Sequence, residues 1–336
     1  MASVLAAAVA LLAAACVPPT PLPSGGFDTS DPDQVIGNGT PQSCTSRSVV
    51  DAVARGGIIV FNCGPSPVTI AMGATAKVFN DTGPEIVLDG RGLVTLSGQG
   101  QRRILYMNTC DPAQRWTTSH CQDQDHPRLT IQNLTFVDGN ATGESVDGGG
   151  GGAVFVRGGR LNIINSVFLR NRCDASGPDV GGGAVRVLSQ HQGQPVRVRN
   201  STFGTPGNGN TCSNGGATAS IGVSWEFADS TFADNRATGV GANPQRPGTP
   251  GGGNGGAIYL DGNYMTLHLK NSLVQDNHAN EGGGAVFFVS NNRSGNQTIE
   301  GSTLLRNPND GFFTAGFPGI FHLGAGPPTV VNSAIG

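Results

Sequence analysis

The last two thirds of the chain repeat one sequence pattern. Each repeat has a short apolar segment, the motif Asn-Ser/Leu-x-Phe, a second Asn soon afterwards, a loop of variable length and the tripeptide Gly-Gly-Ala. The first Asn, or the residue that replaces it, stands at positions 133, 165, 200, 229, 271, 301 and 332. The intervals are 32, 35, 29, 42, 30 and 31 residues, which is typical of stacked structural units. Such stacks serve enzymes, adhesins and structural proteins alike, so the repeat constrains fold more than function.

Within each repeat, apolar and polar residues alternate over segments that are too short for helices. Leu161 with Ile163, and Val196 with Val198, are examples, and a second short apolar segment follows each Gly-Gly-Ala. Alternation with period two predicts strands. No long helical segment separates these strands, which excludes a doubly wound sheet. A two- or three-sided unit that returns about every 30 residues is typical of a parallel solenoid, so we predict an all-β domain over residues 44–336, with clear repeats over 129–336.

The most regular residues of the repeat are predicted to be structural. One apolar position would form a stacked column inside the solenoid: Phe136, Phe168, Phe203, Phe232, Val274 and Leu304. An Asn stands three residues after four of these positions, where the backbone must turn sharply: Asn171, Asn235, Asn277 and Asn307. A side-chain amide there can satisfy turn amides and its neighbours in the stack. Gly-Gly before Ala allows positive φ at the next corner.

These motifs resemble a known family. Gly-Gly-Ala followed by Val or Ile, paired with Phe-x-x-Asn, resembles the repeat of polymorphic outer-membrane proteins and of bacterial right-handed parallel β-helix proteins with the pectin-lyase-like fold. The segment SCTSRSVVDAVARGGIIVFNCG, followed by PVTI and IVLDGRGLVTLSG, resembles the N-terminal segment common in secreted members. The resemblance covers about residues 43 to 336. It implies a single right-handed parallel β-helix in an exported protein and says little about chemistry.

The N-terminus has the composition of an export signal. Residues 3–17 are small and apolar and too short to span a bilayer. We predict a signal peptide over residues 1–16 with Cys16 as a lipobox-like lipidation site. The first basic residue is Arg47, and Ala13 stands where lipoboxes usually carry Leu. Cleavage with release, and an uncleaved segment, therefore stay as alternatives.

Two further segments precede the repeats. Residues 17–43 contain six prolines among Ser, Thr, Gly and Asp, which predicts an extended tether. Residues 44–57 are predicted to contain a capping helix, because Val49, Val50 and Val53 share one helical face and Gly56-Gly57 ends it. Such a helix would close the first coil and hide its strand edge. The chain ends within a repeat with no obvious C-terminal cap; either Pro327-Pro328 blunts the edge or the chain is a fragment.

Six cysteines remain once Cys16 is set aside. An even number in an exported chain argues for disulfides. Six cysteines allow 15 pairings, and their order along the stack favours neighbours: Cys44 with Cys63, Cys110 with Cys121, and Cys173 with Cys212. The last pair would join equivalent loops of successive coils.

The charge balance bears on partners. The net charge is −3 and no basic run occurs, so nothing favours nucleic-acid binding. We expect a monomer that meets an extracellular polysaccharide or another surface macromolecule and touches a membrane only through a lipid anchor. The expected location is the bacterial cell surface or outer membrane, or otherwise the medium.

The strand after Gly-Gly-Ala offers one outward column. If its first apolar residue points inward, the next residues point outward in register: Phe155, Arg186, Ala219, Tyr259 and Phe287. Aromatic rings stack on sugar faces, and Arg binds hydroxyls or carboxylates. We therefore predict a glycan-binding platform of Phe155, Arg186, Tyr259 and Phe287. The alternative is a ladder that stabilises the sheet or lies under the long loops.

The other strand of the repeat offers a second outward column. Its members are Asn162, Arg197, Glu226, His268 and Thr298. Arg197, Glu226 and His268 on successive coils are weak candidates for a catalytic site, because a lyase needs a base and a cation beside the uronate. Ordinary ladder pairs explain the same charges, and Lys270 beside Glu300 in the next column supports that alternative.

Two groups of acidic residues and histidines were weighed as metal ligands. Residues 110–128 contain Asp111, His120, Asp123, Asp125 and His126. The spacing matches no strong motif, so a polar disulfide-closed loop is preferred and no metal site is predicted. Acids before Gly-Gly-Ala would share one edge but lack a calcium-loop signature: Asp138, Glu144, Asp147, Asp174 and Asp179. No cofactor is expected, and calcium is a candidate only if the chain is a lyase.

Three functions remain open at this point. The first is an adhesin-like, non-catalytic surface protein that binds glycan. The second is a polysaccharide lyase or glycoside hydrolase of the pectin-lyase-like fold acting on an acidic polysaccharide, although the motifs that polygalacturonases and pectate lyases display are not evident. The third is a structural spacer without a defined ligand.

Overall fold

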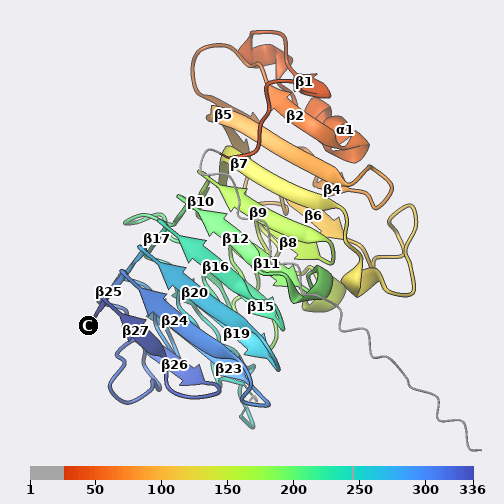
Figure 1. Ribbon diagram of the computed structural model, residues 1–336. Coiled ribbons are helices and arrows are strands. Elements are labelled where there is room, and N and C mark those ends of the chain that lie inside the picture. The colour runs from red at the N-terminus through yellow and green to blue at the C-terminus, as the bar shows by residue number, and fades with distance from the viewer. Residues whose placement is uncertain (1–25, 244–245) are drawn as a thin grey trace, which may run out of the picture.

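The computed structural model describes residues 26–243 and 246–336 (Figure 1). The predicted signal peptide, the lipidation site Cys16 and residues 17–25 of the predicted tether lie outside the described residues. Within these two ranges the fold is mostly β, with large parallel sheets and one α-helix. No helix in the described ranges is long and apolar enough to cross a bilayer.

The strands form three sheets in which the paired strands run parallel. The largest sheet has 17 strands, which are β1 (Gln34–Ile36), β2 (Gly57–Phe61), β3 (Val68–Ala71), β5 (Glu85–Ser97), β7 (Arg128–Val137), β9 (Arg160–Ile164), β10 (Val167–Leu169), β12 (Val196–Arg199), β13 (Thr202–Phe203), β16 (Trp225–Ala228), β17 (Thr231–Ala233), β20 (Thr266–Lys270), β21 (Leu273–Gln275), β24 (Asn296–Glu300), β25 (Thr303–Leu305), β27 (Thr329–Val331) and β28 (Ala334–Ile335).

The other two sheets are smaller. The eight-stranded sheet contains β4 (Ala76–Val78), β6 (Leu105–Asn108), β8 (Val154–Arg157), β11 (Val185–Leu188), β15 (Thr218–Ile221), β19 (Ile258–Gly262), β23 (Val286–Ser290) and β26 (Ile320–Leu323). The three-stranded sheet contains β14 (Thr211–Cys212), β18 (Arg236–Ala237) and β22 (His278–Ala279). Short 3-10 helices occur in the connections: η1 (Pro41–Ser43), η2 (Cys121–Asp123), η3 (Val146–Gly148) and η4 (His191–Gly193).

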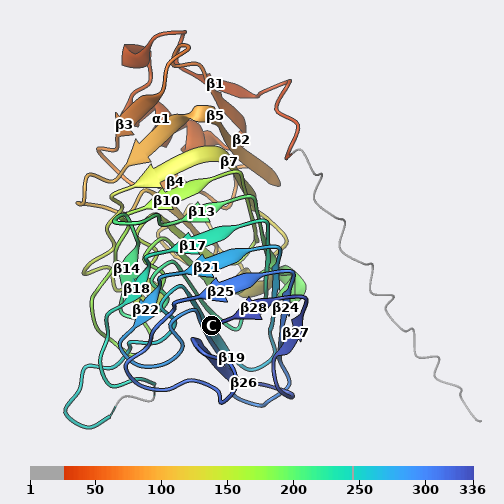
Figure 2. The same ribbon diagram turned by 90° about the vertical axis from the view of Figure 1, so that its left-hand side faces the viewer.

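Each repeat adds one layer to the stack. In the large sheet, β10 pairs with β13, β13 with β17, β17 with β21 and β21 with β25, each in parallel register. Figure 2 shows these five strands one below the other. The same succession holds in the eight-stranded sheet, whose strand order follows the chain from β4 to β26. Equivalent residues of successive repeats are therefore direct neighbours.

The predicted Phe column forms the centre of the core. Phe136, Phe168, Phe203 and Phe232 pair in register and are fully buried. The ring centroids lie 5.1, 4.8 and 4.8 Å apart, and the rings are nearly parallel. Val274 and Leu304 continue the column. This part of the sequence prediction is confirmed.

A buried ladder of Asn side chains follows the Phe column. It contains the four predicted residues and one that the sequence pattern missed: Asn171, Asn210, Asn235, Asn277 and Asn307. The Nδ2 of each of the first four donates to the Oδ1 of the next Asn over 2.8 to 2.9 Å, and the Nδ2 of the last donates to the Val274 carbonyl. Each Oδ1 also accepts from the backbone N–H of the preceding rung. Asn210 stands seven residues after Phe203, because residues 204–209 occupy the place of the usual two residues before the corner.

A second ladder runs at the corner before the Phe column. The backbone N–H of one Ser donates to the hydroxyl of the next over 3.0 to 3.2 Å. Its members are Ser166, Ser201, Ser230, Ser272, Ser302 and Ser333. The residue before each Ser has positive φ, as in Asn165 (48°) and Asn200 (46°). Asn tolerates this left-handed conformation better than most residues, which explains its recurrence in the motif.

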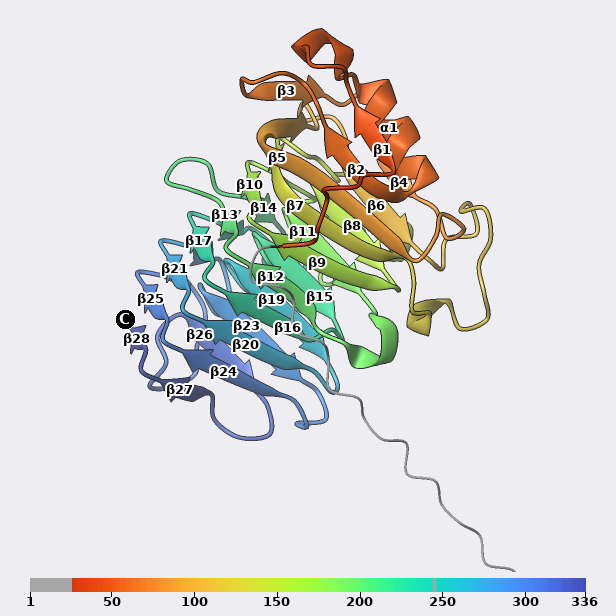
Figure 3. The same ribbon diagram turned by 45° about the horizontal axis from the view of Figure 1, so that its top comes forward.

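The predicted capping helix is α1 (Ser46–Arg55). Thr45 and Ser48 form a capping box at its start, and Gly56 (φ 78°) ends it. Val49, Ala52 and Val53 are buried in the main core. Figure 3 shows α1 beside β1, β2 and β4 at the N-terminal end of the stack. The helix therefore closes the apolar interior of the first layer.

Residues 26–43 differ from the predicted tether. Strand β1 pairs with β2, and η1 follows it. The Phe27 N–H donates to Oε1 of Gln132 (2.8 Å), and the Thr29 hydroxyl donates to Asp89 (2.7 Å). The tether prediction is therefore wrong for these residues. Composition alone does not reveal it, because the partners that hold the segment come from β5 and β7.

Three disulfides join the cysteine pairs that the sequence favours. Cys44 bonds to Cys63, Cys110 to Cys121 and Cys173 to Cys212, with Cα atoms 5.7, 5.1 and 4.8 Å apart. Disulfides are typical of proteins outside the reducing cytosol. The structure thus favours an extracytoplasmic location.

Candidate binding site

The outer face of the eight-stranded sheet carries the predicted column in register. Phe155 pairs with Arg186, Arg186 with Ala219, Ala219 with Tyr259 and Tyr259 with Phe287. The four predicted glycan-binding side chains are nevertheless buried, with exposed fractions of 0% for Phe155 and Tyr259, 1% for Arg186 and 2% for Phe287. The prediction of an open platform is therefore wrong. The column forms a second packed layer, with Ala219, Tyr259 and Phe287 in an apolar cluster of their own.

Glycine-rich loops make this covering layer. A Cβ on Gly150 would lie 2.9 Å from Cδ of Arg186, and one on Gly181 would lie 3.0 Å from its Nη1. Both distances are too short for an unstrained contact, so the two glycines leave the space that Arg186 occupies. The loops before Gly-Gly-Ala thus explain why the column is buried.

Arg186 is a buried cation without a hydrogen-bond partner at two of its nitrogens. Its Nε and Nη1 have no acceptor within the described residues. Burial lowers the pKa of Arg186 to about 10, against the opposing charges of Tyr259, Asp179 and Asp147. The guanidinium remains charged at neutral pH, because a pKa of about 10 still lies well above it.

A polar network surrounds the end of the Tyr259 side chain. Asn243 Nδ2 donates to the Tyr259 hydroxyl (3.1 Å), which donates to Oδ2 of Asp261 (3.2 Å). Asn291 Nδ2 donates to Oδ1 of Asp261 (2.9 Å). Burial, followed by the charge of Asp261, raises the pKa of Tyr259 well above its ordinary value. Burial also raises the pKa of Asp261.

A pocket opens above this network, and we call it the Asp261 pocket. Its volume is about 420 Å³, and its lining residues are Pro178, Asp179, Asn243, Asp261, Phe287, Val289 and Asn291. One wall is apolar and the remainder carries carboxylates and carboxamides. Asn243 Oδ1 is buried and has no donor within the described residues. The arrangement can hold a small ligand that has both an apolar face and hydroxyl groups.

Only part of this pocket is predictable from the sequence. Phe287 belongs to the predicted column, and Asp179 to the group of loop acids. Asp261 and Val289 stand two residues after Tyr259 and Phe287, so strand alternation could have placed them on the same outer face. Asn243 comes from an irregular loop, and no periodic signal locates it.

The weak catalytic candidates lie on a different surface, the outer face of the large sheet. Arg197, Glu226 and His268 are neighbours in register, as predicted. Arg197 Nε lies 3.0 Å from Glu226 Oε2, whereas His268 Nε2 lies 3.2 Å from Glu300. Hydrogen bonding from His268, with the charge of Lys270, lowers the pKa of Glu300. These charges form ladder pairs, which is the alternative that the sequence left open.

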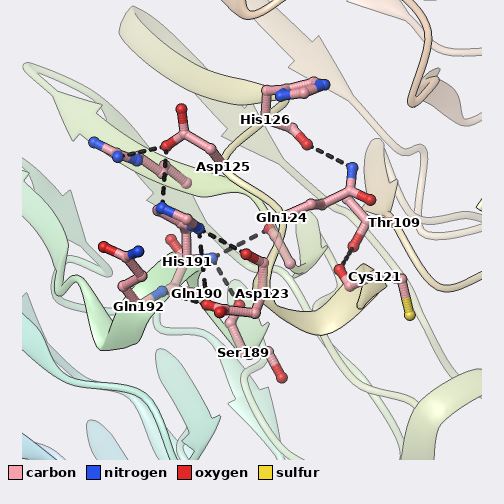
Figure 4. Close-up of polar contacts among 12 residues, drawn as sticks. Thr109, Cys121, Asp123, Gln124, Asp125, His126, Ser189, Gln190, His191 and Gln192 are labelled. Atoms are coloured by element: carbon pink, nitrogen blue, oxygen red, sulfur yellow. Dashed lines mark hydrogen bonds and ion pairs between the residues drawn. The ribbon is translucent and has the colours of Figure 1, made fainter. Parts of the chain in front are cut away.

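The candidate metal ligands of residues 110–128 do not converge on one point. Asp111 accepts from the Tyr106 hydroxyl (2.9 Å). His191 Nδ1 lies 2.6 Å from the backbone oxygen of Asp123, and Asp125 forms ion pairs with Arg128 and Arg160. Figure 4 shows His191 between Asp123 and Asp125. In residues 26–243 and 246–336, no three His, Cys, Asp or Glu side chains are placed to hold a metal ion.

These contacts join the disulfide-closed loop, which follows β6, to η4, which follows β11 two layers further along the stack. The backbone N–H of Gln192 donates to Asp123 (2.5 Å), and His191 Nε2 lies 3.6 Å from Asp125. The loop is therefore anchored at its C-terminal end.

In comparisons with known proteins, no family model, curated protein or solved structure matches this chain. The function must therefore be argued from the geometry above.

Proposed function

We propose that this chain is an exported surface protein that binds a neutral glycan in the Asp261 pocket without turning it over. The proposal includes a single right-handed parallel β-helix of the pectin-lyase-like kind. Three parallel sheets that gain one layer per repeat, and a capping helix at the first layer, support that fold. The three disulfides and the signal-like residues 1–16 with Cys16 support export and a lipid anchor.

The observation that carries the proposal is the composition of the pocket walls. Pro178 and Val289 supply apolar surface beside the almost fully buried Phe287, while Asp179, Asn243, Asp261 and Asn291 supply hydrogen-bonding groups. A sugar ring has an apolar C–H face and a rim of hydroxyls, and apolar side chains pack on the former. Carboxylates and carboxamides bind the latter. A volume of about 420 Å³ lies within the usual range for small-ligand sites.

The charges around the pocket favour a neutral glycan. Asp179 and Asp261 line the pocket, so a uronate carboxylate would meet like charge. Arg186 interacts electrostatically with Asp179, but its Nε and Nη1 are buried out of contact with solvent. These two nitrogens are therefore not offered to a ligand.

The state of Tyr259 supports binding over turnover. Its hydroxyl is held between Asn243 and Asp261, and burial raises its pKa well above the ordinary value. A tyrosine in this state keeps its proton at neutral pH and is a poor general base.

Affinity electrophoresis in gels that contain neutral or uronate polysaccharides tests the proposal. We expect retardation in at least one neutral gel (cellulose derivative, xylan, mannan or starch). Asp179→Ala with Asn291→Ala should reduce it, because both side chains line the pocket and are exposed. Asp31→Ala is the matched control, since Asp31 is exposed and distant from the pocket lining.

Two outcomes would overturn this function. The first is equal retardation of the wild type and the double variant. The second is the appearance of unsaturated products, followed by ultraviolet absorbance, on incubation with uronate polysaccharides. Loss of such products in Glu226→Ala or Arg197→Ala would establish the lyase alternative.

A further inference from the structure

A second concave site lies at the N-terminal part of the stack, around Trp116. The pocket has a volume of about 470 Å³ and is lined by Asn80, Asp81, Gly83, Pro84, Trp116 and His126. Residues 80–84 follow β4, whereas Trp116 and His126 belong to the loop between β6 and β7. Trp116 is 39% exposed, which is unusual for the largest apolar side chain.

The backbone that presents Trp116 is fixed from several sides. The Cys110–Cys121 disulfide closes the loop. Asn80 Nδ2 donates to the carbonyls of Thr109 (3.0 Å) and Trp116 (2.5 Å). The Arg115 guanidinium lies 4.8 Å from the ring centre of Phe79 and forms an ion pair with Asp81 at 3.2 Å. An aromatic ring held in this way loses little freedom when a ligand packs on it.

Several polar groups at this site have no partner among the described residues. Asn80 is 1% exposed, and its Oδ1 accepts no hydrogen bond within the described residues. The bonds of Asn80 and Gln124 in this region end on the backbone oxygens of Trp116 and His126. In the described ranges, no hydrogen bond involves the imidazole of His126 or Nε1 of Trp116. Of these groups, Asn80 Oδ1 is the buried one, and an unsatisfied buried group is rare in folded proteins and calls for an explanation.

We infer that this Trp116 pocket is a second sugar-binding site, separate from the Asp261 pocket. The ligand is a pyranose ring of a neutral glycan, packed on the indole of Trp116 and hydrogen-bonded to His126 and Nε1 of Trp116. The site carries little net charge, because Arg115 is paired with Asp81, so it offers no charged partner to a uronate or an amine. Its ligand class rests on the proposed function, but its location and residues do not.

The two pockets are formed by different elements and lined by different residues. The Asp261 pocket is formed by strand ends and loops of the later repeats, with a buried Phe wall and two carboxylates. The Trp116 pocket is formed by an insertion and presents an exposed indole. Loss of one site should therefore leave the other intact.

The chain offers its own spectroscopic probe for this site. It has two tryptophans, and Trp225 is 1% exposed within the main core. Emission that acrylamide quenches therefore comes from Trp116. We expect a saturable blue shift and protection from acrylamide on titration of the full chain with at least one of cellohexaose, xylohexaose, mannohexaose and maltohexaose.

Matched variants test whether the fluorescence response and the retention arise from the Trp116 pocket. Trp116→Ala should weaken retention on the corresponding polysaccharide gel on the order of tenfold, as expected for loss of an aromatic stacking surface. His126→Gln should weaken the fluorescence response, whereas Asp179→Ala should leave it unchanged. Because Trp116 is exposed, the melting temperature of Trp116→Ala should match that of the wild type, which confirms that the variant is folded.

The inference is overturned if none of the four oligosaccharides changes the emission of Trp116. It is also overturned if Asp179→Ala abolishes the response while His126→Gln leaves it intact. A response in the Trp116 site without any effect of Asp179→Ala and Asn291→Ala on retention would instead overturn the proposed function of the Asp261 pocket alone.

Discussion

The corners that flank the Phe column and the outer face of the eight-stranded sheet belong to the same repeats. They differ in whether buried polar groups find hydrogen-bond partners. At the corners, the Ser and Asn ladders give each amide or hydroxyl a partner that is its own copy in the next repeat. On the outer face, successive positions hold Phe155, Arg186, Ala219, Tyr259 and Phe287. No identical neighbour exists there to satisfy a polar group.

Buried polar atoms without a hydrogen-bond partner occur outside the two ladders. Within the described residues, buried side-chain atoms without a partner include those of Asn80, Arg186 and Asn243. None of the rungs of the two ladders is among them. The two ladders are therefore fully satisfied, whereas the loop residues Asn80 and Asn243, which line the two pockets, are not.

Removal of a ring from the Phe column should have the largest effect. Phe203→Ala should cost about 4 kcal/mol in the free energy of unfolding, since the ring is fully buried between two others and leaves a cavity. Phe287→Ala should cost clearly less, because that ring already borders a pocket. Urea titration measures both. An equal cost at the two positions would contradict the distinction between the two regions.

Interruption of the Asn ladder should cause the second-largest loss in the free energy of unfolding. Asn235→Ala removes the side-chain acceptor of the Asn210 N–H and Nδ2 and the side-chain donor to the Phe203 carbonyl, at a cost of about 3 kcal/mol for buried polar groups. Asn277 Oδ1 keeps one hydrogen bond, from the backbone N–H of residue 235. Asn263→Ala is the matched control, because Asn263 is exposed and its side chain belongs to no ladder. If urea titration shows the same small loss for both variants, the ladders are not the source of stability that we describe.

The hydrogen bond from Thr29 to Asp89 joins the N-terminal segment, residues 26–33, to the stack, and a variant of Asp89 tests its contribution. Burial alone would raise the pKa of Asp89, but hydrogen bonds from Asn133, Gln132, Thr29 and the N–H of Arg91 together lower it. The stability that it contributes is therefore present above its unfolded pKa of 3.8 and is lost as the pH falls through the lower folded value.

In Asp89→Asn, one side-chain oxygen no longer accepts from Thr29 and Gln132. We expect a local loss of about 1 kcal/mol, seen as faster hydrogen exchange at Phe27 and faster proteolysis of residues 26–33. Exchange within the Phe column should not change. Slow exchange at Phe27 in the variant would show that β1 alone holds this segment.

Asp261→Asn should have a small effect of opposite sign. The folded pKa of Asp261 is raised by burial above the unfolded value of 3.8, so the ionised form lowers stability as the pH rises through that interval. The neutral amide avoids this cost. We expect a slightly higher melting temperature than the wild type at pH 7 and no difference at pH 3. A lower melting temperature at pH 7 would mean that the carboxylate is needed by its neighbours.

The sequence predicts the satisfied region well. The Phe column and four rungs of the Asn ladder follow from positions that recur with the period of the stack, since each of these residues packs on its own copy. The capping helix follows from its apolar face, and the three disulfide pairs follow from the order of the cysteines along the chain. Asn210 was missed because four extra residues break the Phe-x-x-Asn spacing while the ladder continues.

The sequence predicts the candidate site poorly, because the site depends on loops that do not follow the repeat. Alternation places Arg186 and Tyr259 on the outer face correctly, but their burial depends on loops of unequal length and on the space left by Gly150 and Gly181. Asn243 lies in one of these loops. The order of Phe27 and Thr29 likewise depends on Asp89 and Gln132, which are far away in sequence.

The insertion at residues 204–209 has a practical consequence. The chain leaves the stack after Phe203, passes through the exposed Pro206 and Gly207, and rejoins the ladder at Asn210 with hydrogen bonds like those of its neighbours. Both ends of the excursion are fixed by the layers above and below. A foreign peptide grafted between Pro206 and Gly207 should therefore be displayed at the surface at almost no cost to folding, which makes this corner a natural attachment point for an epitope or a label.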